Sequence, residues 1–239
     1  MKRALVTGAS GHIGAAIAAS LAADGHHVYL HAHGQLPRAE TLAAEIRAHG
    51  GSAEAVRFDI TRPEDTQATL GAILAAGPIQ ILVNNAGIHD DAVMPGMRAD
   101  QWSRVIDVSL NGFFNVTQPL LLPMIRTRWG RIVNISSISA IMGNRGQANY
   151  AAAKAGLHGA ARALSLELAS RGITVNTVAP GIIASPATET LFPQEAIAQM
   201  VPMQRAGQPE EVADLVCFLA SERAGYISGQ LISINGGMA

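Results

Sequence analysis

Short apolar runs alternate with longer amphipathic segments along the whole chain. The short runs predict buried strands at 4–6, 27–32, 53–58, 79–83, 131–135, 173–178 and 231–234. The longer segments predict helices at 13–23, 36–49, 63–74, 102–126, 150–169 and 209–220. Strands that alternate with helices form right-handed βαβ units, which place the strands in one parallel sheet covered by helices on both faces. The pattern therefore predicts an α/β fold: a single doubly wound parallel sheet of about seven strands over residues 1–239.

Composition and charge narrow the class of protein. The chain is 49% apolar and 15% charged, with a net charge of −1. A nearly neutral chain lacks the charge that attracts nucleic acid or an anionic membrane surface, so neither is an expected partner. No apolar stretch approaches the ~18 residues of a membrane span, and glycines interrupt the N-terminal apolar run too early for a signal peptide. With Cys217 interpreted as a buried core thiol, we expect a cytoplasmic protein.

A glycine-rich turn, Thr7 to Gly14, follows the first predicted strand. Glycines there allow close approach to a pyrophosphate, whose charge a helix N-terminus stabilises; a plain tight turn is the alternative. Asp59 and Asn85 follow the third and fourth strands at the same edge, although a helix N-cap or a turn residue is an alternative for each. The coincidence of three strand ends favours a dinucleotide site with contacts at Gly8, Ser10, Gly11, His12, Ile13, Gly14, Asp59, Ile60, Asn85, Ala86 and Gly87.

The end of the second strand indicates which nicotinamide cofactor is bound. An acidic residue there binds the ribose 2′-hydroxyl of NAD, but this strand ends in His31-Ala32-His33-Gly34, without an acid. His12, His33 and Arg38 offer cationic or hydrogen-bonding partners for a 2′-phosphate, so we expect NADPH. Two lone histidines on one strand are poor evidence for a metal site, and no metal is expected.

Tyr150 and Lys154 lie four residues apart in a predicted helix and so share one of its faces. A serine cluster at 136–139 ends the preceding strand and can reach the same point. A carbonyl reductase needs these three groups: a phenol to donate a proton, an ammonium that favours the phenolate, and a hydroxyl to hold the substrate oxygen.

Together these motifs resemble the short-chain dehydrogenase/reductase family. The motifs cover nearly the whole chain: Thr7-Gly8…Gly14, Asn84-Asn85-Ala86-Gly87, Ser137, Tyr150-x-x-x-Lys154 and Pro180-Gly181. Within the family the chain is most similar to the 3-oxoacyl-[acyl-carrier-protein] reductases, through residues 142–150 and 226–238. The segment 199–203 is similar to the variants of aryl-polyene and polyketide pathways. The resemblance implies a Rossmann-like NAD(P)-binding domain that reduces a 3-oxoacyl thioester on acyl carrier protein with NADPH.

The resemblance also implies roles for individual residues. Tyr150 would be the general acid, Lys154 would lower its pKa and bind the nicotinamide ribose, and Ser137 would hold the substrate carbonyl. Further cofactor contacts are implied at Pro180, Gly181, Ile183 and Ser185, and substrate or carrier contacts at Asn144, Gln147, Arg128 and Arg171. Residues 182–208 would form a lid over the substrate, and the chain would assemble as a homotetramer. For Arg128 and Arg171, the alternative is that they are ordinary solvated surface residues. For the methionines within residues 182–208, the alternative is that they fill gaps in the core.

Two positions depart from the family pattern. His12 stands where Gly or Ala is usual, and Ser109 stands where the family has a catalytic Asn. Asn111 lies about 200° further around the predicted helix and cannot simply replace it. The family residue holds a relay water partly through its backbone carbonyl, so we expect Ser109 to do this, with a slower relay. Two other functions remain open: reduction or oxidation of a small free alcohol, sugar or steroid, and a weakly active nucleotide-binding partner subunit.

Overall fold

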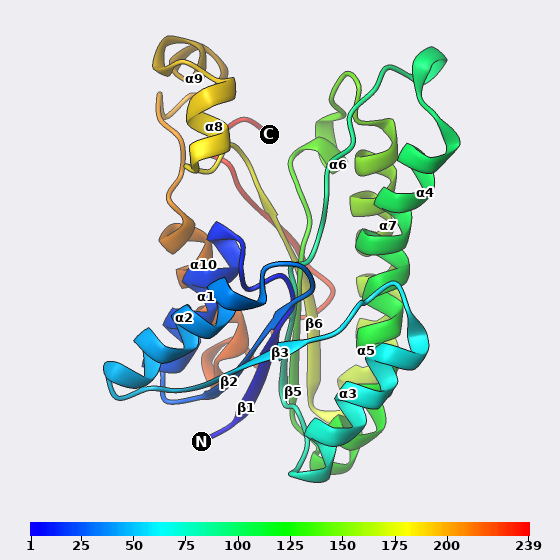
Figure 1. The fold of residues 1–239 in the computed structure, drawn as a ribbon, viewed down its shortest axis with the longest axis vertical. Helices are drawn as coiled ribbons and strands as arrows, with labels where there is room; N and C mark the ends of the chain where they lie inside the picture. Colours follow the sequence, from blue (N-terminus) through cyan, green and yellow to red (C-terminus); the bar gives the residue numbers. More distant parts are fainter.

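Seven parallel strands form the sheet in the computed structural model, which describes residues 1–239 (Figure 1). Their order across the sheet is β3-β2-β1-β4-β5-β6-β7. The strands are β1 Arg3–Val6, β2 His27–Ala32, β3 Ser52–Arg57, β4 Ile81–Asn84, β5 Gly130–Ile135, β6 Ile173–Pro180 and β7 Leu231–Ile234. The order reverses between β1 and β4, which is the topological switch point of a doubly wound sheet. The predicted α/β fold class is confirmed.

Helices cover both faces of the sheet (Figure 1). One face carries α1 His12–Ala23, α2 Leu36–Ala48 and α10 Pro209–Ala220, and the other carries α3 Pro63–Ala75, α4 Ala99–Ile106, α5 Gly112–Thr127 and α7 Ala148–Leu168. Shorter helices are α6 Ser139–Met142, α8 Pro186–Leu191 and α9 Gln194–Met200, with 3₁₀ turns at Met94–Gly96, Ala169–Arg171 and Glu222–Ala224. None of the helices combines the length and apolarity needed to cross a membrane.

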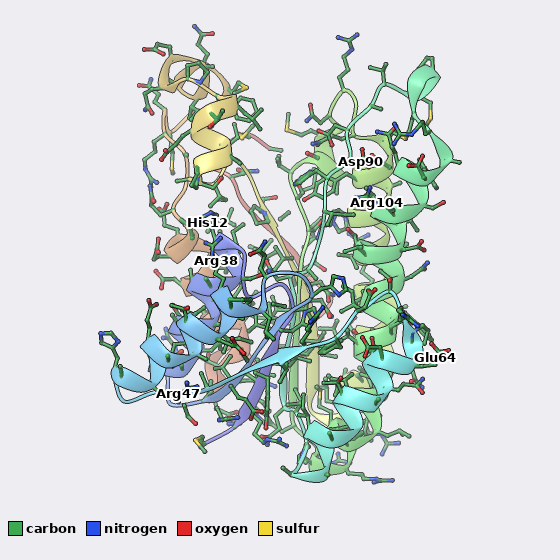
Figure 2. All side chains as sticks on the ribbon, viewed as in Figure 1. His12, Arg38, Arg47, Glu64, Asp90 and Arg104 are labelled. Carbon is green, nitrogen blue, oxygen red and sulfur yellow. The ribbon has the colours of Figure 1, made fainter.

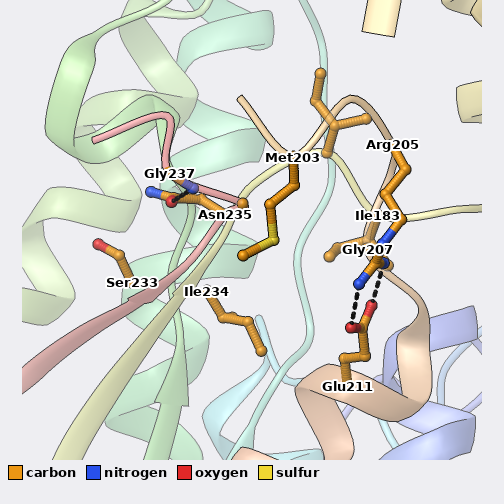
Figure 3. Close-up of a pocket in the computed structure, with 11 residues that line it drawn as sticks. Ile183, Met203, Arg205, Gly207, Glu211, Ser233, Ile234, Asn235 and Gly237 are labelled. Carbon is orange, nitrogen blue, oxygen red and sulfur yellow. Dashed lines mark hydrogen bonds and ion pairs between the residues drawn. The ribbon is translucent and has the colours of Figure 1, made fainter. Parts of the chain in front are cut away.

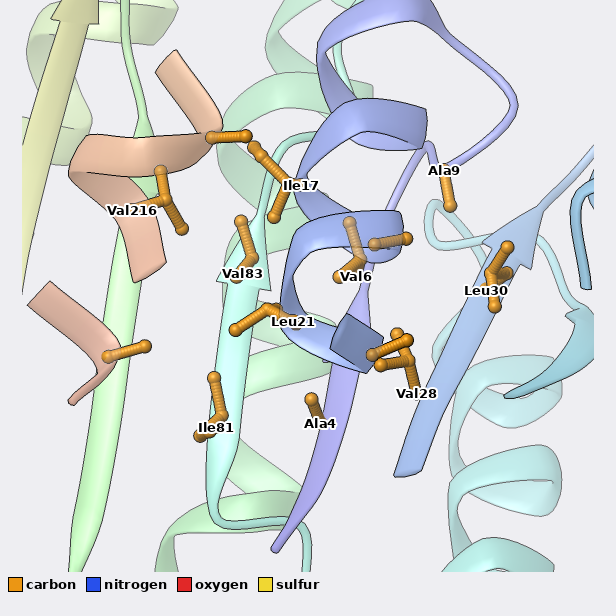
Figure 4. Close-up of a cluster of buried hydrophobic side chains, with 14 of the residues drawn as sticks. Ala4, Val6, Ala9, Ile17, Leu21, Val28, Leu30, Ile81, Val83 and Val216 are labelled. Atoms are coloured by element: carbon orange, nitrogen blue, oxygen red, sulfur yellow. The ribbon is translucent and has the colours of Figure 1, made fainter. Parts of the chain in front are cut away.

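The core consists of two apolar layers, one on each side of the sheet. Val6 of β1 packs with Ile17 and Leu21 of α1 on one side, as Figure 4 shows, while Leu5 points into the other layer. Successive residues of a strand point to opposite faces, so a strand that is covered on both faces must be apolar at every position. This explains why the strands are nearly continuous apolar runs in the sequence.

The predicted long helix at 102–126 is interrupted in the structure. Between α4 and α5 lies a π-helical turn, Asp107–Asn111, with Ser109 at its centre. Such turns insert an extra residue into the helical repeat and often occur at functional sites. This turn lies on the same face of the sheet as α7, which carries Tyr150 and Lys154.

Candidate active site

The glycine turn after β1 is tied to the end of β4. Asn85 Nδ2 donates hydrogen bonds to the carbonyl oxygens of Thr7 at 2.9 Å and Gly8 at 3.1 Å. Thr7 Oγ1 accepts from the backbone N–H groups of Asn85 and Ala86, both at 3.0 Å. Gly8 has a φ of +64°, and a Cβ at Gly14 would collide with the Gly8 carbonyl oxygen and lie 2.6 Å from Asn85 Nδ2. The turn therefore requires glycine at both positions in order to close against β4.

The N-terminus of α1 fits an anionic ligand. No side chain caps this helix, and its first turn contains no acidic residue. Gly11 and His12 are exposed at the turn, with Ser10 and Ile13 half-buried beside them. Uncapped N–H groups and the helix dipole both favour negative charge, so this turn fits the pyrophosphate of a dinucleotide.

A buried histidine, His31, is hydrogen-bonded to this turn. It was not among the site residues predicted from the sequence. His31 Nδ1 accepts a hydrogen bond from the backbone N–H of Gly8 at 3.2 Å, and its Nε2 lies 2.9 Å from the Phe58 carbonyl oxygen. These partners assign the proton to Nε2. Burial lowers the pKa of His31 to about 4, so the imidazole is neutral at pH 7. His31 therefore links the glycine turn to the end of β3 without adding charge.

The three residues proposed to meet a 2′-phosphate are exposed after β1 and β2. Arg38 Nη2 lies 3.5 Å from His12 Nδ1 (Figure 2). His33 is also exposed, and its charge contributes to the lowered pKa of Asp59. No acidic residue follows β2, where a ribose 2′-hydroxyl would need one.

Asp59 and Ile60 lie just beyond β3. Burial raises the pKa of Asp59, but hydrogen bonds from the Thr61 hydroxyl and backbone N–H outweigh this effect and lower it. Both bonds go to Asp59 Oδ1, at 2.7 and 2.9 Å. Ile60 is buried, and its carbonyl oxygen accepts from Asn115 Nδ2 at 2.8 Å. Asp59 therefore has a structural role in this turn, whether or not its second oxygen contacts a ligand.

The end of β5 and the first turns of α7 bring Ser137, Tyr150 and Lys154 together. The Ser137 hydroxyl lies close enough to the Tyr150 phenol to lower its pKa, and it accepts a hydrogen bond from the Ser139 N–H at 3.1 Å. Lys154 Nζ lies 5.9 Å from the centroid of the Tyr150 ring and donates to the Ile135 carbonyl oxygen at 2.8 Å. Tyr150 is 8% exposed and Lys154 is 2% exposed, and Lys154 forms no ion pair.

Burial shifts the pKa values of the phenol and the ammonium in opposite directions. It raises the pKa of Tyr150 to about 12, an effect that the nearby Ser137 hydroxyl opposes and the charge of Asp91 reinforces. It lowers the pKa of Lys154 to about 8. Tyr150 is therefore held in its protonated form at neutral pH, as a proton donor must be before it reacts.

Of the three serines near this point, only Ser137 acts on the pKa of Tyr150. Ser136 Oγ donates to the Lys154 carbonyl oxygen at 3.1 Å and lies 2.6 Å from His158 Nε2. Ser139 Oγ donates to Gln147 Oε1 at 2.9 Å. The other two serines have partners elsewhere, and the role of Ser137 that the family spacing implied stays a prediction.

Asn144 and Gln147 lie at the rim of the site, but their amides bond within the protein. Asn144 Nδ2 donates to Gln147 Oε1 at 3.0 Å, and Gln147 Nε2 donates to Asp91 Oδ2 at 2.8 Å. Asp91 was absent from the residues predicted from the sequence. It lies four residues after Gly87, beyond the carboxyl end of β4, and this position was the signal that could have found it.

Ser109 lies in the π-helical turn next to Lys154. Its side chain is 3% exposed, and its Oγ has no hydrogen-bond partner. A Cβ at Gly87 would lie 3.0 Å from Lys154 Nζ and 3.6 Å from Ser109 Oγ, so both groups face this glycine. Ser109 also lines a cavity of about 10 Å³, which suits a single water molecule. Asn111 does not replace it, because its exposed amide donates to Asp107 Oδ1 at 2.7 Å.

The end of β6 carries the four implied nicotinamide contacts: Pro180, Gly181, Ile183 and Ser185. The Gly181 N–H donates to the Ile234 carbonyl oxygen at 2.9 Å, which continues the pairing with β7. Ser185 caps α8, because its Oγ accepts from the backbone N–H of Thr188 at 3.1 Å. Ser185 therefore has a structural partner that fixes where α8 begins.

A cavity of about 350 Å³ opens beside this segment (Figure 3). Ile183, Met203 and Ile234 supply apolar walls, and a two-pronged ion pair between Arg205 and Glu211, at 2.7 Å for each bond, stands at its edge. The cavity lies between the end of β7 and the segment that follows α9. It borders the predicted cofactor contact Ile183 and does not include Ser137, Tyr150 or Lys154.

Arg128 and Arg171 lie together at the amino-terminal ends of the strands, whereas Tyr150 lies near their carboxyl ends. Arg128 Nη2 donates to the Ser170 carbonyl oxygen at 3.1 Å, and the two arginines precede β5 and β6. Tyr150 instead lies at the carboxyl ends of these strands, about 17 Å along β5 at the usual rise per residue. Within one chain, the two arginines therefore do not line the entrance to the site.

The fold and this site together define a class of protein. A doubly wound parallel sheet, a glycine turn that fits a pyrophosphate, and a buried tyrosine–lysine pair with a serine are the parts of a nicotinamide-dependent oxidoreductase. Comparison with known proteins agrees. The chain belongs to the short-chain dehydrogenase/reductase family, and the family profile described as "Enoyl-(Acyl carrier protein) reductase" matches residues 8–239.

Curated relatives are similar over nearly their whole length. The chain is 44% identical to the 3-oxoacyl-[acyl-carrier-protein] reductase FabG of Aggregatibacter actinomycetemcomitans, over 98% of both chains. It is 43% identical to the FabG of Staphylococcus aureus, over 99% of this chain and 98% of that one. It is 45% identical to the 3-oxoacyl-[acyl-carrier-protein] reductase of Synechocystis, over 98% and 96% respectively. The resemblance to the short-chain dehydrogenase/reductase family and to its 3-oxoacyl-[acyl-carrier-protein] reductases is confirmed.

Proposed function

We propose that this protein reduces the 3-oxo group of an acyl thioester carried on acyl carrier protein, with NADPH as the hydride donor. One observation carries the proposal: Tyr150 is buried and protonated, with the Ser137 hydroxyl close enough to lower its pKa, beside a buried lysine that has no counter-ion. The relatives that are similar over their full length are named for this reaction. Their names point to fatty-acid biosynthesis, and the segment 199–203 keeps a polyene or polyketide pathway as the narrower alternative.

The nicotinamide, when bound, supplies a hydride to the carbonyl carbon. The chain's own residues then act on the carbonyl oxygen. Ser137 Oγ holds that oxygen, and Tyr150 donates its phenolic proton to it. The ammonium of Lys154 stabilises the phenolate that results, because a nearby positive charge favours the ionised form. Proton transfer of this kind contributes about 10²–10⁴-fold to a rate.

Ser109 has a supporting role in this proposal. Its unpartnered Oγ lines a small cavity that suits one water molecule, and Ser109 Oγ and Lys154 Nζ both face Gly87. Such a water can return a proton toward Tyr150 through Lys154 after each turnover. A serine hydroxyl is shorter than the usual asparagine side chain, so we expect it to hold the water less firmly.

The preference for NADPH rests on the groups at the ends of β1 and β2. Arg38 approaches His12, His33 is exposed nearby, and no acid follows β2. A 2′-phosphate matches this arrangement, because arginine and imidazole donate hydrogen bonds and lack the negative charge that would repel it. A 2′-hydroxyl would gain less from the same groups.

The carrier protein and the lid complete the proposal. The helices α8 and α9 stand above the carboxyl edge of the sheet, where residues 182–208 would cover the acyl chain (Figure 1). Phe114 and Leu166 are exposed on α5 and α7, which suits burial between copies in a homotetramer. Because Arg128 and Arg171 lie far from their own Tyr150, docking of an acidic carrier requires that they serve the site of a neighbouring copy.

The direct test is NADPH oxidation with three substrates. With a 3-oxoacyl thioester on acyl carrier protein we expect turnover, and slower turnover when NADH replaces NADPH. With a small free ketone we expect little or no turnover. A 2-enoyl thioester on the same carrier is the control, because the family profile carries the name of an enoyl reductase. Tyr150→Phe should lower the 3-oxoacyl rate by about 10²-fold or more. Binding of NADPH without thioester turnover would contradict the proposal and favour a weakly active partner subunit.

A further inference from the structure

A second aromatic side chain lies against the phenol of Tyr150. The imidazole of His89 stacks on the Tyr150 ring with 4.1 Å between centroids and a tilt of 34°. His89 follows β4, two residues after Gly87, and is itself an exposed residue. One side of the imidazole therefore covers the phenol, while the residue remains open to solvent at the edge of the site.

Three successive residues hold the segment that carries His89. The Asp90 carbonyl oxygen accepts from Asn149 Nδ2 at 2.9 Å, the Asp91 carboxylate accepts from Gln147 at 2.8 Å, and the Ala92 N–H donates to the Gly146 carbonyl oxygen at 2.9 Å. All three partners lie in α7 or in the loop that precedes it. The segment that carries His89 is therefore hydrogen-bonded to the same helix and loop that position Tyr150. The stacking is thus built into the fold.

A second contact anchors the same segment to α4. The Asp90 carboxylate accepts from Gln101 Nε2 at 2.6 Å and forms an ion pair with Arg104 at 3.4 Å (Figure 2). Asp90 is therefore already neutralised by Arg104. The charged groups left to act on His89 are Asp91 on its own segment and Lys154 on α7.

Burial against the site lowers the pKa of His89, Asp91 raises it and Lys154 lowers it. The net direction is downward, so the imidazole becomes charged at a lower pH than a free histidine does. A positive charge this close to the phenol would favour the phenolate. Tyr150 would then be a stronger acid when His89 is protonated.

We propose that His89 is a positioning residue for Tyr150, which holds the phenol by stacking and strengthens it as an acid when the imidazole becomes charged. The inference rests on the proposed function, in which Tyr150 donates the proton. It adds a titratable group to the site, in a place that the family motifs do not include.

Two substitutions separate the stacking from the charge. His89→Phe keeps an aromatic ring and removes the titration, while His89→Ala removes both. At pH 8 we expect His89→Ala to lower kcat by about three- to tenfold, the range that the loss of one aromatic pair gives, and His89→Phe to recover most of that loss. His49→Phe, on the far end of α2, is the matched control and should leave kcat unchanged.

The pH profile is the decisive measurement. The ratio of wild-type kcat to that of His89→Phe should rise as the pH falls from about 8 to 5.5, while the KM for NADPH should be the same in the two proteins at each pH. A ratio that is constant with pH would overturn the proposal, and so would a Phe variant as impaired as the Ala variant at every pH. Tyr150→Phe distinguishes failure of the proposed function from failure of the role of His89. If Tyr150→Phe stays active, the proposed function itself fails. If Tyr150→Phe is inactive and the kcat ratio is constant with pH, only the role of His89 fails.

Discussion

Two buried cations, Arg131 and Lys154, lie toward opposite ends of β5 and are treated very differently by the fold. Arg131 is 3% exposed, and its guanidinium donates to the carbonyl oxygens of Gly130 and Ser221, at 2.8 and 3.1 Å. It also lies over the Trp129 ring at 4.3 Å and 3.8 Å from the Glu222 carboxylate. Lys154 is equally buried, but the single hydrogen bond of its ammonium is to the Ile135 carbonyl oxygen.

The difference separates a structural cation from a reactive one. Burial lowers the pKa of both groups, but Glu222 partly offsets this for Arg131, and no carboxylate does so for Lys154. An ammonium has three N–H donors, and leaving them unpaired in a buried place destabilises the charged form. A fold that retains such a group does so where a ligand or a reacting atom completes its surroundings.

The largest expected effect is on catalysis, from removing the reactive cation. Lys154→Met should lower kcat by about 10²-fold or more, because the phenolate of Tyr150 loses its stabilising charge. The free energy of unfolding at pH 7 should be unchanged or higher, since an apolar side chain of similar length replaces a buried charge without a counter-ion. Steady-state kinetics and urea denaturation measure the two effects. A loss of stability equal to that of a core deletion would contradict the comparison.

The matched substitution at the other end of β5, Arg131→Met, should lower the stability of the protein and leave catalysis unchanged. Arg131→Met leaves the Ser221 carbonyl oxygen without its donor and removes the cation from the Trp129 ring. We expect a loss of about 2–3 kcal/mol in the free energy of unfolding, with kcat of the folded enzyme unchanged. Glu222 is mostly exposed, so its lost ion pair adds little. A large fall in kcat at full stability would show that Arg131 acts on the site.

The smallest effect concerns the residue behind Lys154. Ser109→Asn restores the usual side chain of the family and should leave kcat unchanged or raise it by up to about tenfold, because a longer amide holds the relay water more firmly. Ser109→Ala, which removes the hydroxyl from the same cavity, is the control. Pre-steady-state kinetics with NADPH would show whether the proton step changes. A large loss of activity in Ser109→Asn would mean that this site uses another arrangement.

The sequence predicted the sheet well because apolar runs record burial on both faces. The strands at 27–32 and 231–234 and the helix at 209–220 have the predicted bounds, and the boundaries of the other predicted strands and helices differ by only a few residues, apart from the interrupted helix at 102–126. The π-helical turn at 107–111 escaped prediction, since one inserted residue hardly changes the apolar period around it. The position of Arg128 was implicit in the predicted sheet, because a residue before a parallel strand lies at the edge opposite the ligand.

Site residues could be predicted where reactive side chains stand at the spacing of a regular helix. They could not be predicted where their place in the site depends on how loops pack. The pair Tyr150 and Lys154 follows from helical spacing alone. His31 and His89 depend on which loop lies against which strand end, and no local period records that. His31 was visible near the end of one predicted strand and His89 beyond the end of another, but only the structure gives one a bond to Gly8 and the other a stacking contact with Tyr150.

The comparison between the two cations is tested most directly by the titration of Lys154. Lys2 and Lys154 are the only lysines of the chain, so ¹³C-labelled lysine gives two signals, and Lys2→Arg leaves only that of Lys154. NMR of the protein without cofactor should show Lys154 titrating with a pKa of about 8, well below the ordinary value of 10.5. A pKa at or above 10.5 would mean that the ammonium already has a full set of partners, and the account of Lys154 as an uncompensated, reactive cation would be wrong.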